Sequence, residues 1–344
     1  MTALDGAFNS VVETATATVD PMPGKHIAFV RGRDEAGNWG PVRAIFISDG
    51  GLSSLSFTPD ETIGGKPSIG TVTLDAPAPG GGAVVSLSSG NTAVVTVPAS
   101  VVIPAGQTTR TFTATTSPVS TATNVTVDAS FGGSSVQAVL RVLPPSLKKL
   151  TVASASFVAP CQTTTGKVTL TGKAPAGGVQ INLTTTNPAL TIPPSVTVPA
   201  GSTNATFNIS GTAVTATTTG LVKATPANSA FGTITLTKSV SVLPNQAASL
   251  VVPTPITGPA TVIANMALTC AAGAGGQLVT LSTSNAAIAE PVDQNGNPIS
   301  SMMIAAGQTA GTFRVRAADV PAPATVKIKV KVNGLAKTAT VTVN

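Results

Sequence analysis

The sequence is poor in the side chains that usually carry chemistry. Its 344 residues include no Tyr, one Trp, one His and two Cys, and only 9% are charged, against about 25% in typical soluble proteins. Because His26 is the only imidazole, no two-histidine metal site can form, and no Ser–His–Asp relay can form without it. His26 is expected to be structural. We predict a protein that is not an enzyme and needs no cofactor or metal.

Long hydrophobic runs are also missing. No apolar stretch approaches the roughly 20 residues of a membrane helix, so we predict no membrane insertion. Residues 1–5 lack the basic start and apolar stretch of a signal peptide. The composition is nevertheless that of a secreted protein. We therefore expect an extracellular or cell-surface location, with this chain as the C-terminal part of a longer or processed protein.

Thr, Ser, Val, Ala and Gly fill the space that charged and aromatic residues leave. Thr and Val favour strands, and 33 Gly and 27 Pro supply frequent turns. A chain rich in Thr, Ala and Pro can be disordered, but a hydrophobic fraction of 42% is enough apolar mass to offset chain entropy. The composition predicts a folded, all-β protein.

Internal repetition is the strongest signal. An element close to Pro-Ala-Gly-x-Thr-x-x-Thr-Phe ends at Phe112, Phe207 and Phe313. The three copies recur at intervals of roughly 100 residues, with many short alternating segments between them, which is the size and pattern of an immunoglobulin-like (Ig-like) sandwich. Turn pairs Gly132-Gly133 and Asn333-Gly334 each predict the last hairpin of a repeat.

We predict Ig-like domains over residues 51–144, 145–244 and 245–344, after a partial domain over 1–50. Val-Leu-Pro ends the first two repeats, and each Pro stiffens the exit, so we expect short, semi-rigid linkers. With domains about 40 Å long, the expected arrangement is an extended rod.

Residues 52–344 resemble the hyalin-repeat and invasin-like families of bacterial Ig-like domains, on the repeated element and the strand rhythm. This resemblance implies a stalk, spacer or adhesion module of a secreted or surface protein. It is specific for fold and says little about a ligand.

Residues 1–50 differ from the repeats. A strand within 23–34, a turn at 35–41 and a strand at 42–48 resemble the last strands of the Ig-like domain that follows the catalytic domain in some secreted bacterial peptidases, including zinc carboxypeptidases. Only the C-terminal strands of such a domain are present. Its exposed apolar face is expected to include Ile27, Phe29, Ile45 and Ile47. We expect a neighbouring subunit, or upstream chain, to cover these residues.

Trp39 and the pair Asp60-Glu61 are both predicted to have structural roles. Trp39, in a turn, is predicted to cap the core of the partial domain, with carbohydrate stacking as the alternative. Asp60-Glu61 is assigned to a solvated loop, because a glycosidase needs two carboxyl groups facing across a cleft.

Two features of the third repeat are also predicted to be structural. The stretch 293–297 is predicted to be a hairpin turn; a calcium loop is the alternative, although the distal Glu is missing. Lys327, Lys329 and Lys331 alternate with apolar residues and predict one solvated strand face, which can also discourage edge pairing. Without partner aromatics it does not predict nucleic-acid binding.

The two cysteines, Cys161 and Cys270, are predicted to form a disulfide across a domain boundary. By alignment of the repeats, Cys161 lies in the turn after the first strand of its domain, and Cys270 lies just past the second strand of the next. In an Ig-like sandwich both positions face the same interface. A secreted compartment permits oxidation. Two unrelated buried thiols remain the alternative.

The leading functional prediction is a non-catalytic extracellular structural or adhesive protein: a cell-surface stalk, or a fibre subunit assembled head to tail by β-strand complementation. Its partners would be copies of itself or the upstream part of its own polypeptide. The alternative is the accessory C-terminal tail of a secreted bacterial peptidase. A carbohydrate-binding module would need an exposed aromatic platform, which one Trp and no Tyr supply poorly.

Overall fold

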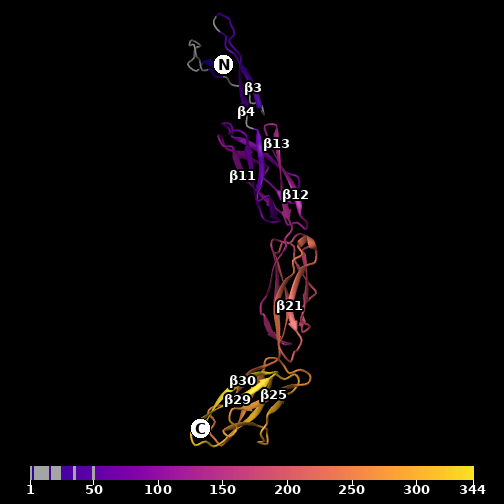
Figure 1. Ribbon diagram of the computed structural model, residues 1–344, viewed down its shortest axis with the longest axis vertical. Coiled ribbons are helices and arrows are strands. Elements are labelled where there is room, and N and C mark those ends of the chain that lie inside the picture. Colours follow the sequence, from indigo (N-terminus) through magenta and orange to yellow (C-terminus); the bar gives the residue numbers. More distant parts are fainter. Residues whose placement is uncertain (1, 4–14, 17–24, 34–35, 49–50) are drawn as a thin grey trace. The chain divides into compact units, whose positions relative to one another are not determined.

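The computed structural model describes residues 2–3, 15–16, 25–33, 36–48 and 51–344 (Figure 1). Strands dominate these residues, and the only helix among them is a single 3-10 turn, η1 (Ser229–Phe231). The predicted all-β class is confirmed. No helix within the described ranges is long and apolar enough to cross a membrane. The turn expected around residue 24 lies outside the described residues.

The chain divides into two compact units, Met1–Pro145 with Thr171–Gly177, and Ser146–Leu170 with Gly178–Asn344. Unit 1 contains one Ig-like sandwich and an N-terminal hairpin, and unit 2 contains the strands of two further sandwiches. The predicted domain limits at 50/51, 144/145 and 244/245 stay a prediction.

The first sandwich consists of a five-stranded sheet, ordered β10-β8-β12-β13-β6, and a four-stranded sheet, ordered β5-β7-β11-β9. One core fills the space between the sheets, with Val72, Val85 and Val127 fully buried. The strands are β5 (Leu52–Thr58), β6 (Glu61–Ile63), β7 (Ser68–Leu74), β8 (Ala83–Ser89), β9 (Val95–Thr96), β10 (Ser100–Ile103), β11 (Thr109–Thr116), β12 (Thr123–Phe131) and β13 (Ser134–Leu143).

The second sandwich repeats this plan with sheets β14-β16-β20-β18 and β15-β22-β21-β17-β19. Val168, Ile181 and Val222 are fully buried inside it. The strands are β14 (Leu147–Val152), β15 (Ser156–Val158), β16 (Thr164–Leu170), β17 (Val179–Thr185), β18 (Leu190–Thr191), β19 (Ser195–Val198), β20 (Asn204–Gly211), β21 (Thr218–Pro226) and β22 (Leu236–Leu243).

The third sandwich has two four-stranded sheets, β23-β24-β28-β26 and β27-β25-β29-β30. Val279, Ile328 and Val341 are fully buried between them. The strands are β23 (Ala247–Val251), β24 (Ala260–Leu268), β25 (Gln277–Thr283), β26 (Ala289–Val292), β27 (Ser301–Ile304), β28 (Ala310–Ala317), β29 (Ala324–Val332) and β30 (Leu335–Val343).

The first strand of each sandwich changes sheets. In the first sandwich β5 pairs antiparallel with β7, and β6 then pairs parallel with β13 in the opposite sheet. The second sandwich does the same with β14 and β15, and the third retains only a parallel bridge between Ile256 and Val343. A cis peptide bond precedes Pro59, Pro160 and Pro255 near this change.

The sheet change corrects the assignment of Glu61 to a loop, whereas Asp60 lies in the exposed bend before β6. Glu61 begins β6, opposite Arg141 of β13, and Arg141 donates a 2.5 Å hydrogen bond from its guanidinium group to the Glu61 carboxylate. The sequence did not indicate β6 because three residues are too few to show a strand period, and their partner lies 80 residues away.

Turn residues formed the hairpins that the sequence predicted. Gly132 and Gly133, with φ of 56° and 77°, join β12 to β13, and Asn333 and Gly334, with φ of 47° and 84°, join β29 to β30. Positive φ at both central positions gives the twist that two-residue hairpins require.

The Phe of the repeated element has a specific packing partner. Phe112 and Phe207 lie opposite Gly70 and Gly166 on the neighbouring strand. A Cβ atom on either Gly would come within 2.2 Å of the ring, so the ring fills the volume that a side chain would occupy. In the third sandwich Phe313 lies opposite Ala264. The repeated Phe is therefore a core residue.

Candidate functional site: the disulfide junction and the N-terminal hairpin

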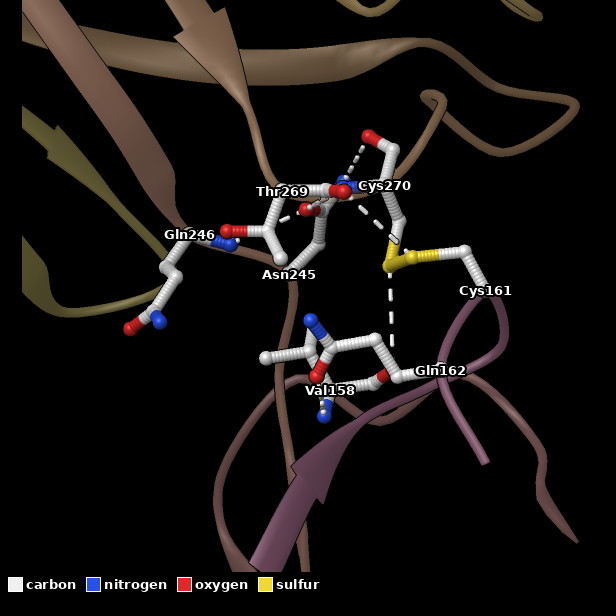
Figure 2. The surroundings of a disulfide bond; sticks show 7 residues. All are labelled: Val158, Cys161, Gln162, Asn245, Gln246, Thr269 and Cys270. Atoms are coloured by element: carbon white, nitrogen blue, oxygen red, sulfur yellow. Dashed lines mark hydrogen bonds between the residues drawn. A yellow bond between two sulfur atoms is a disulfide. The ribbon is translucent and has the colours of Figure 1, made fainter. Parts of the chain in front are cut away.

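Cys161 and Cys270 form a disulfide with a Cα–Cα distance of 5.5 Å (Figure 2). Cys161 lies in the turn after β15 and is exposed, while Cys270 follows β24 and is only 2% exposed. Both cysteines belong to unit 2. The bond therefore links the turn after the first strand of the second sandwich to the end of β24 in the third, as the alignment of the repeats predicted.

Asn245 fixes the backbone beside Cys270. Its side-chain oxygen accepts hydrogen bonds from the backbone N–H of Cys270 at 2.9 Å and of Gln246 at 3.0 Å, and its amide nitrogen donates to the Cys270 carbonyl at 2.8 Å. Asn245 is one of the few buried polar residues in the described part of the chain. Its amide thus pairs with both backbone groups of Cys270, as a neighbouring strand would.

Gln162 plays a similar part on the other side of the bond. Its side-chain oxygen accepts from the Val158 N–H at 3.0 Å, and its own N–H donates to the Val158 carbonyl at 3.0 Å. The Cys270 sulfur lies 3.7 Å from that carbonyl oxygen. Each cysteine therefore lies in a loop that is fixed by hydrogen bonds. Together the two loops hold the Cα atoms at a distance that a disulfide can bridge.

Sequence reasoning missed Asn245 and Gln162, although one signal was present. Leu243-Pro244 is followed by Asn245, whereas Leu143-Pro144 is followed by Pro145. A short amide side chain readily bonds neighbouring backbone groups. Replacement of Pro by Asn at the linker of the cysteine-bearing repeats could therefore have pointed to a polar contact there.

The N-terminal hairpin pairs β3 (Lys25–Val30) with β4 (Arg43–Ser48) and forms a two-stranded sheet. Of the predicted interface residues, Ile27 is 50% exposed, Phe29 71% and Ile45 51%. The side chain of Ile47 lies outside the description, although its backbone pairs with His26. β1 (Thr2–Ala3) and β2 (Ala15–Thr16) form a separate pair.

The register of the hairpin corrects the prediction of one apolar face. Ile27 pairs with Phe46 and Ala28 pairs with Ile45, and directly paired residues point to the same side of a sheet. Ile27 and Phe29 therefore lie on one face, and Ile45 lies on the other. The hairpin exposes apolar side chains on both faces.

Trp39 does not cap a core, contrary to the prediction. It is 55% exposed and bridges to Arg33 across the hairpin. The guanidinium carbon of Arg31 lies 4.0 Å from the ring centroid and that of Arg33 lies 5.5 Å from it. These cation–π contacts occupy space that a stacked sugar would need, which disfavours the carbohydrate alternative.

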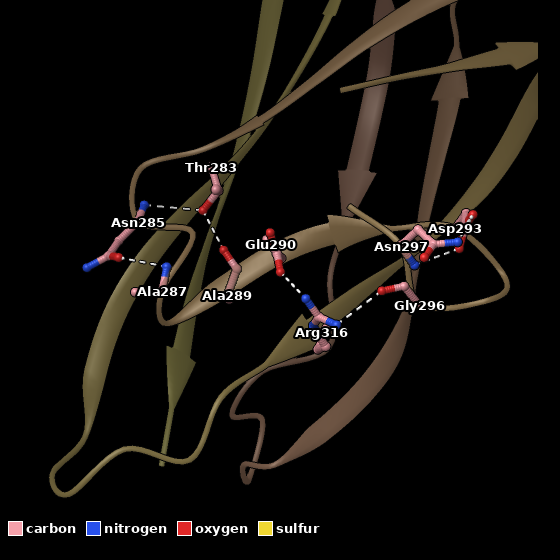
Figure 3. Close-up of polar contacts among 9 residues, drawn as sticks. All are labelled: Thr283, Asn285, Ala287, Ala289, Glu290, Asp293, Gly296, Asn297 and Arg316. Carbon is pink, nitrogen blue, oxygen red and sulfur yellow. Dashed lines mark hydrogen bonds and ion pairs between the residues drawn. The ribbon is translucent and has the colours of Figure 1, made fainter. Parts of the chain in front are cut away.

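Figure 3 shows the polar contacts of the third sandwich. The Asp293 carboxylate accepts hydrogen bonds from the backbone N–H groups of Asn295 and Asn297, both at 2.8 Å, and from the Asn297 side chain at 3.1 Å. These bonds close the predicted hairpin turn. A calcium ion requires free oxygen ligands, whereas this carboxylate faces donors. No cluster of three or more potential metal ligands occurs within the described part of the chain.

The same view places Arg316 between two acceptors. It pairs with the Glu290 carboxylate and donates to the Gly296 carbonyl at 3.1 Å. Nearby, the Thr283 hydroxyl donates to the Ala289 carbonyl at 2.7 Å. Arg316 is therefore engaged within its own sandwich, and its bond to Gly296 holds the loop between β26 and β27 against β28.

The turn at Asp293 should respond to acid. Hydrogen bonds from Asn297, first from its backbone and then from its side chain, lower the pKa of the Asp293 carboxyl below its ordinary value of 3.8. A lowered pKa stabilises the turn above pH 3.8, and this stabilisation is lost as the pH falls through the folded-state pKa. We expect an NMR titration of Asp293 to show a midpoint below 3.8, and the amides of Asn295 and Asn297 to shift with the same midpoint. A midpoint at or above 3.8 would contradict the hydrogen bonding.

No family model and no curated protein matches the chain. The solved structures to which the chain shows similarity include bacterial adhesin domains. The D0–D1 domain of intimin is 13% identical, with 57% of this chain and 98% of that chain covered and a TM-score of 0.25. The adhesin InvE of Yersinia pseudotuberculosis is 14% identical (56% and 60% covered, TM-score 0.28). Invasin, a bacterial integrin-binding protein, is 15% identical (93% and 65% covered, TM-score 0.27). The topology, burial and repeats define the chain as a tandem array of Ig-like β-sandwiches.

Proposed function

We propose that this chain is a non-catalytic extracellular structural or adhesive protein, acting as a cell-surface stalk or as a subunit of a fibre. Subunits join when the N-terminal hairpin of one copy receives a strand or sheet edge from the next. The single observation that carries the proposal is the hairpin β3–β4, with apolar side chains exposed on both faces.

An isolated two-stranded hairpin is marginally stable in water. Within the described residues, β3 and β4 pair only with each other, so each has an outer edge with free backbone donors and acceptors. Such edges accept an additional strand. Phe29 is the most exposed large apolar residue of the described chain, at 71%. Covering both the faces and the edges requires more chain, and a neighbouring copy supplies it in a head-to-tail arrangement.

The test replaces exposed apolar residues of the hairpin and compares the effect on assembly with that of the same replacements in the sandwiches. In wild-type protein we expect the sedimentation coefficient to rise with concentration and fibres to appear by negative-stain microscopy. The variant Phe29→Asp/Ile45→Asp places a charge on each hairpin face and should reduce assembly at least about tenfold, since burying an unpaired charge is strongly unfavourable.

The matched control is Val139→Asp/Ile263→Asp, at strand positions 51% and 55% exposed outside the hairpin. It should assemble like wild type. Wild-type protein that stays monomeric at every concentration, or a control variant that loses assembly equally, would show that the hairpin is not the joint.

A second candidate, the accessory tail of a secreted peptidase, is supported by the same hairpin and by its Trp39 turn. In that case strands encoded upstream of residue 1 cover the hairpin within one polypeptide. Expressing the chain together with any coding sequence upstream separates the two: a monomer with a buried Phe29 favours the tail, and concentration-dependent assembly favours the fibre.

A further inference from the structure

We propose that the outer face of the sheet β27-β25-β29-β30 binds an extended acidic polysaccharide along a row of lysines. Lys327, Lys329 and Lys331 of β29 are exposed and point away from the core, since they alternate with fully buried Val326, Ile328 and Val330. Figure 1 labels three of the four strands, β25, β29 and β30.

The lysine row does not serve to protect an edge, which corrects the interpretation from the sequence. β29 lies between β25 and β30 and pairs with both, so it has no free edge. Successive residues on one side of a strand are about 6.7 Å apart, and like charges at that spacing repel. The three aligned ammonium groups therefore do not stabilise the sheet, and they do not shield an edge.

Nothing in the same sheet offsets the three charges. The four strands contain four Lys and no Asp or Glu. Among the described residues, the ion pairs join Arg141 to Glu61 and Arg316 to Glu290, and neither involves the row. The sandwich thus neutralises Arg316 on its other sheet and leaves the row available to an external anion.

The other sandwiches show that the fold does not need these lysines. The register aligns Lys329, opposite Ser282, with Asp128, opposite Ser88, and with Lys223, opposite Thr184. The positions that align with Val326, Ile328 and Val330 are buried in all three sandwiches and hold small or apolar residues: Val125, Val127 and Ala129 in the first, and Gly220, Val222 and Ala224 in the second. The exposed residues differ: the row aligns with Thr126, Asp128 and Ser130 in the first sandwich and with Leu221, Lys223 and Thr225 in the second. The third sandwich alone carries a cationic row.

The surroundings of the row fit a sugar polymer. Exposed hydroxyls flank it on both sides, from Thr280 and Ser282 of β25 and from Thr338 and Thr340 of β30. A shallow depression at one end of the row is lined by Lys327 and Lys329 together with Ser282, Thr338 and Thr340. Hydroxyls donate and accept hydrogen bonds, as sugar hydroxyls do, while the lysines meet successive carboxylate or sulfate groups. The four strands contain no aromatic residue, so the face lacks the stacking platform of single-stranded nucleic-acid binders.

Binding is measured on the full chain with polygalacturonate as the carboxylated probe, heparin as the sulfated probe and dextran as the neutral one. We expect binding to at least one acidic polymer, weakening as salt rises, and none to dextran. The variant Lys327→Gln/Lys329→Gln/Lys331→Gln should bind roughly a hundredfold more weakly, as expected for three lysines near an anionic surface.

The matched control is Lys148→Gln/Lys149→Gln/Lys238→Gln, which removes the same charge at exposed positions of the second sandwich. It should keep most of the affinity. Equal losses in both variants would show that net charge alone acts, and overturn the proposal. So would binding to neither acidic polymer, or binding to oligothymidylate as tight as to the polysaccharide. This inference extends the adhesive part of the proposed function, and it fails separately from the hairpin joint because it is measured on a different sheet.

Discussion

Removing the Cys161–Cys270 disulfide is expected to lower the free energy of unfolding of the second and third sandwiches by about 4–5 kcal/mol. The cysteines are 109 residues apart in sequence, and in the chain-entropy model a cross-link that closes so long a loop restricts the unfolded chain by about that amount. Urea denaturation of oxidised protein and of the Cys161→Ser/Cys270→Ser variant measures the difference.

Two controls make this result specific. Reductant should lower the stability of wild-type protein but leave the serine variant unchanged. The Cys270 amide should keep part of its protection from hydrogen exchange in the variant, because Asn245 accepts its N–H without involving sulfur. Equal unfolding of oxidised and reduced protein, or two free thiols in freshly isolated protein, would contradict the bridge.

Truncation of the repeated Phe should lower the free energy of unfolding nearly as much as removal of the disulfide. Phe112 is 7% exposed, lies over Gly70, and meets the ring of Phe57 edge-to-face at a centroid distance of 6.1 Å. Phe112→Ala removes these contacts and leaves a cavity that Gly70 cannot fill. We expect a loss of about 3–5 kcal/mol in the stability of the first sandwich, measurable by calorimetry as a lower melting temperature.

The chain offers a matched control in Phe29. This residue is 71% exposed, so Phe29→Ala in monomeric protein should change stability by no more than about 0.5 kcal/mol. Similar shifts for the two variants would mean that Phe112 is not part of a packed core. Gly70→Ala should also destabilise, because the new methyl group meets the ring.

The disulfide could be predicted in part from the sequence, by aligning the three repeats. Alignment placed Cys161 and Cys270 at neighbouring ends of consecutive sandwiches, because strand direction alone decides which end a turn occupies. The hydrogen bonds that present the two cysteines were not predictable in the same way. They depend on Asn245 and Gln162 reaching particular backbone groups, which requires coordinates.

The hairpin shows the opposite case. Ile27, Phe29, Ile45 and Ile47 were assigned to one apolar face of the partial domain. Alternation decides which side chains of one strand share a face. The register between two strands decides which side chains of the second strand lie on that same face. That register depends on the connection between Val30 and Arg43, whose length and turn chemistry gave no two-residue hairpin signal.

Strand content, the repeats and the two-residue turns were determined by the sequence itself, because they depend on local properties: β-branched composition, a period of two, and glycine or asparagine at positive φ. Only the tertiary structure decided that Glu61 lies in a strand, that Trp39 is exposed beside Arg31, and that Lys329 lies on a central strand rather than an edge. Each of these depends on pairing between segments far apart in the chain. Such pairing is selected by the burial of whole faces, and no local pattern encodes it.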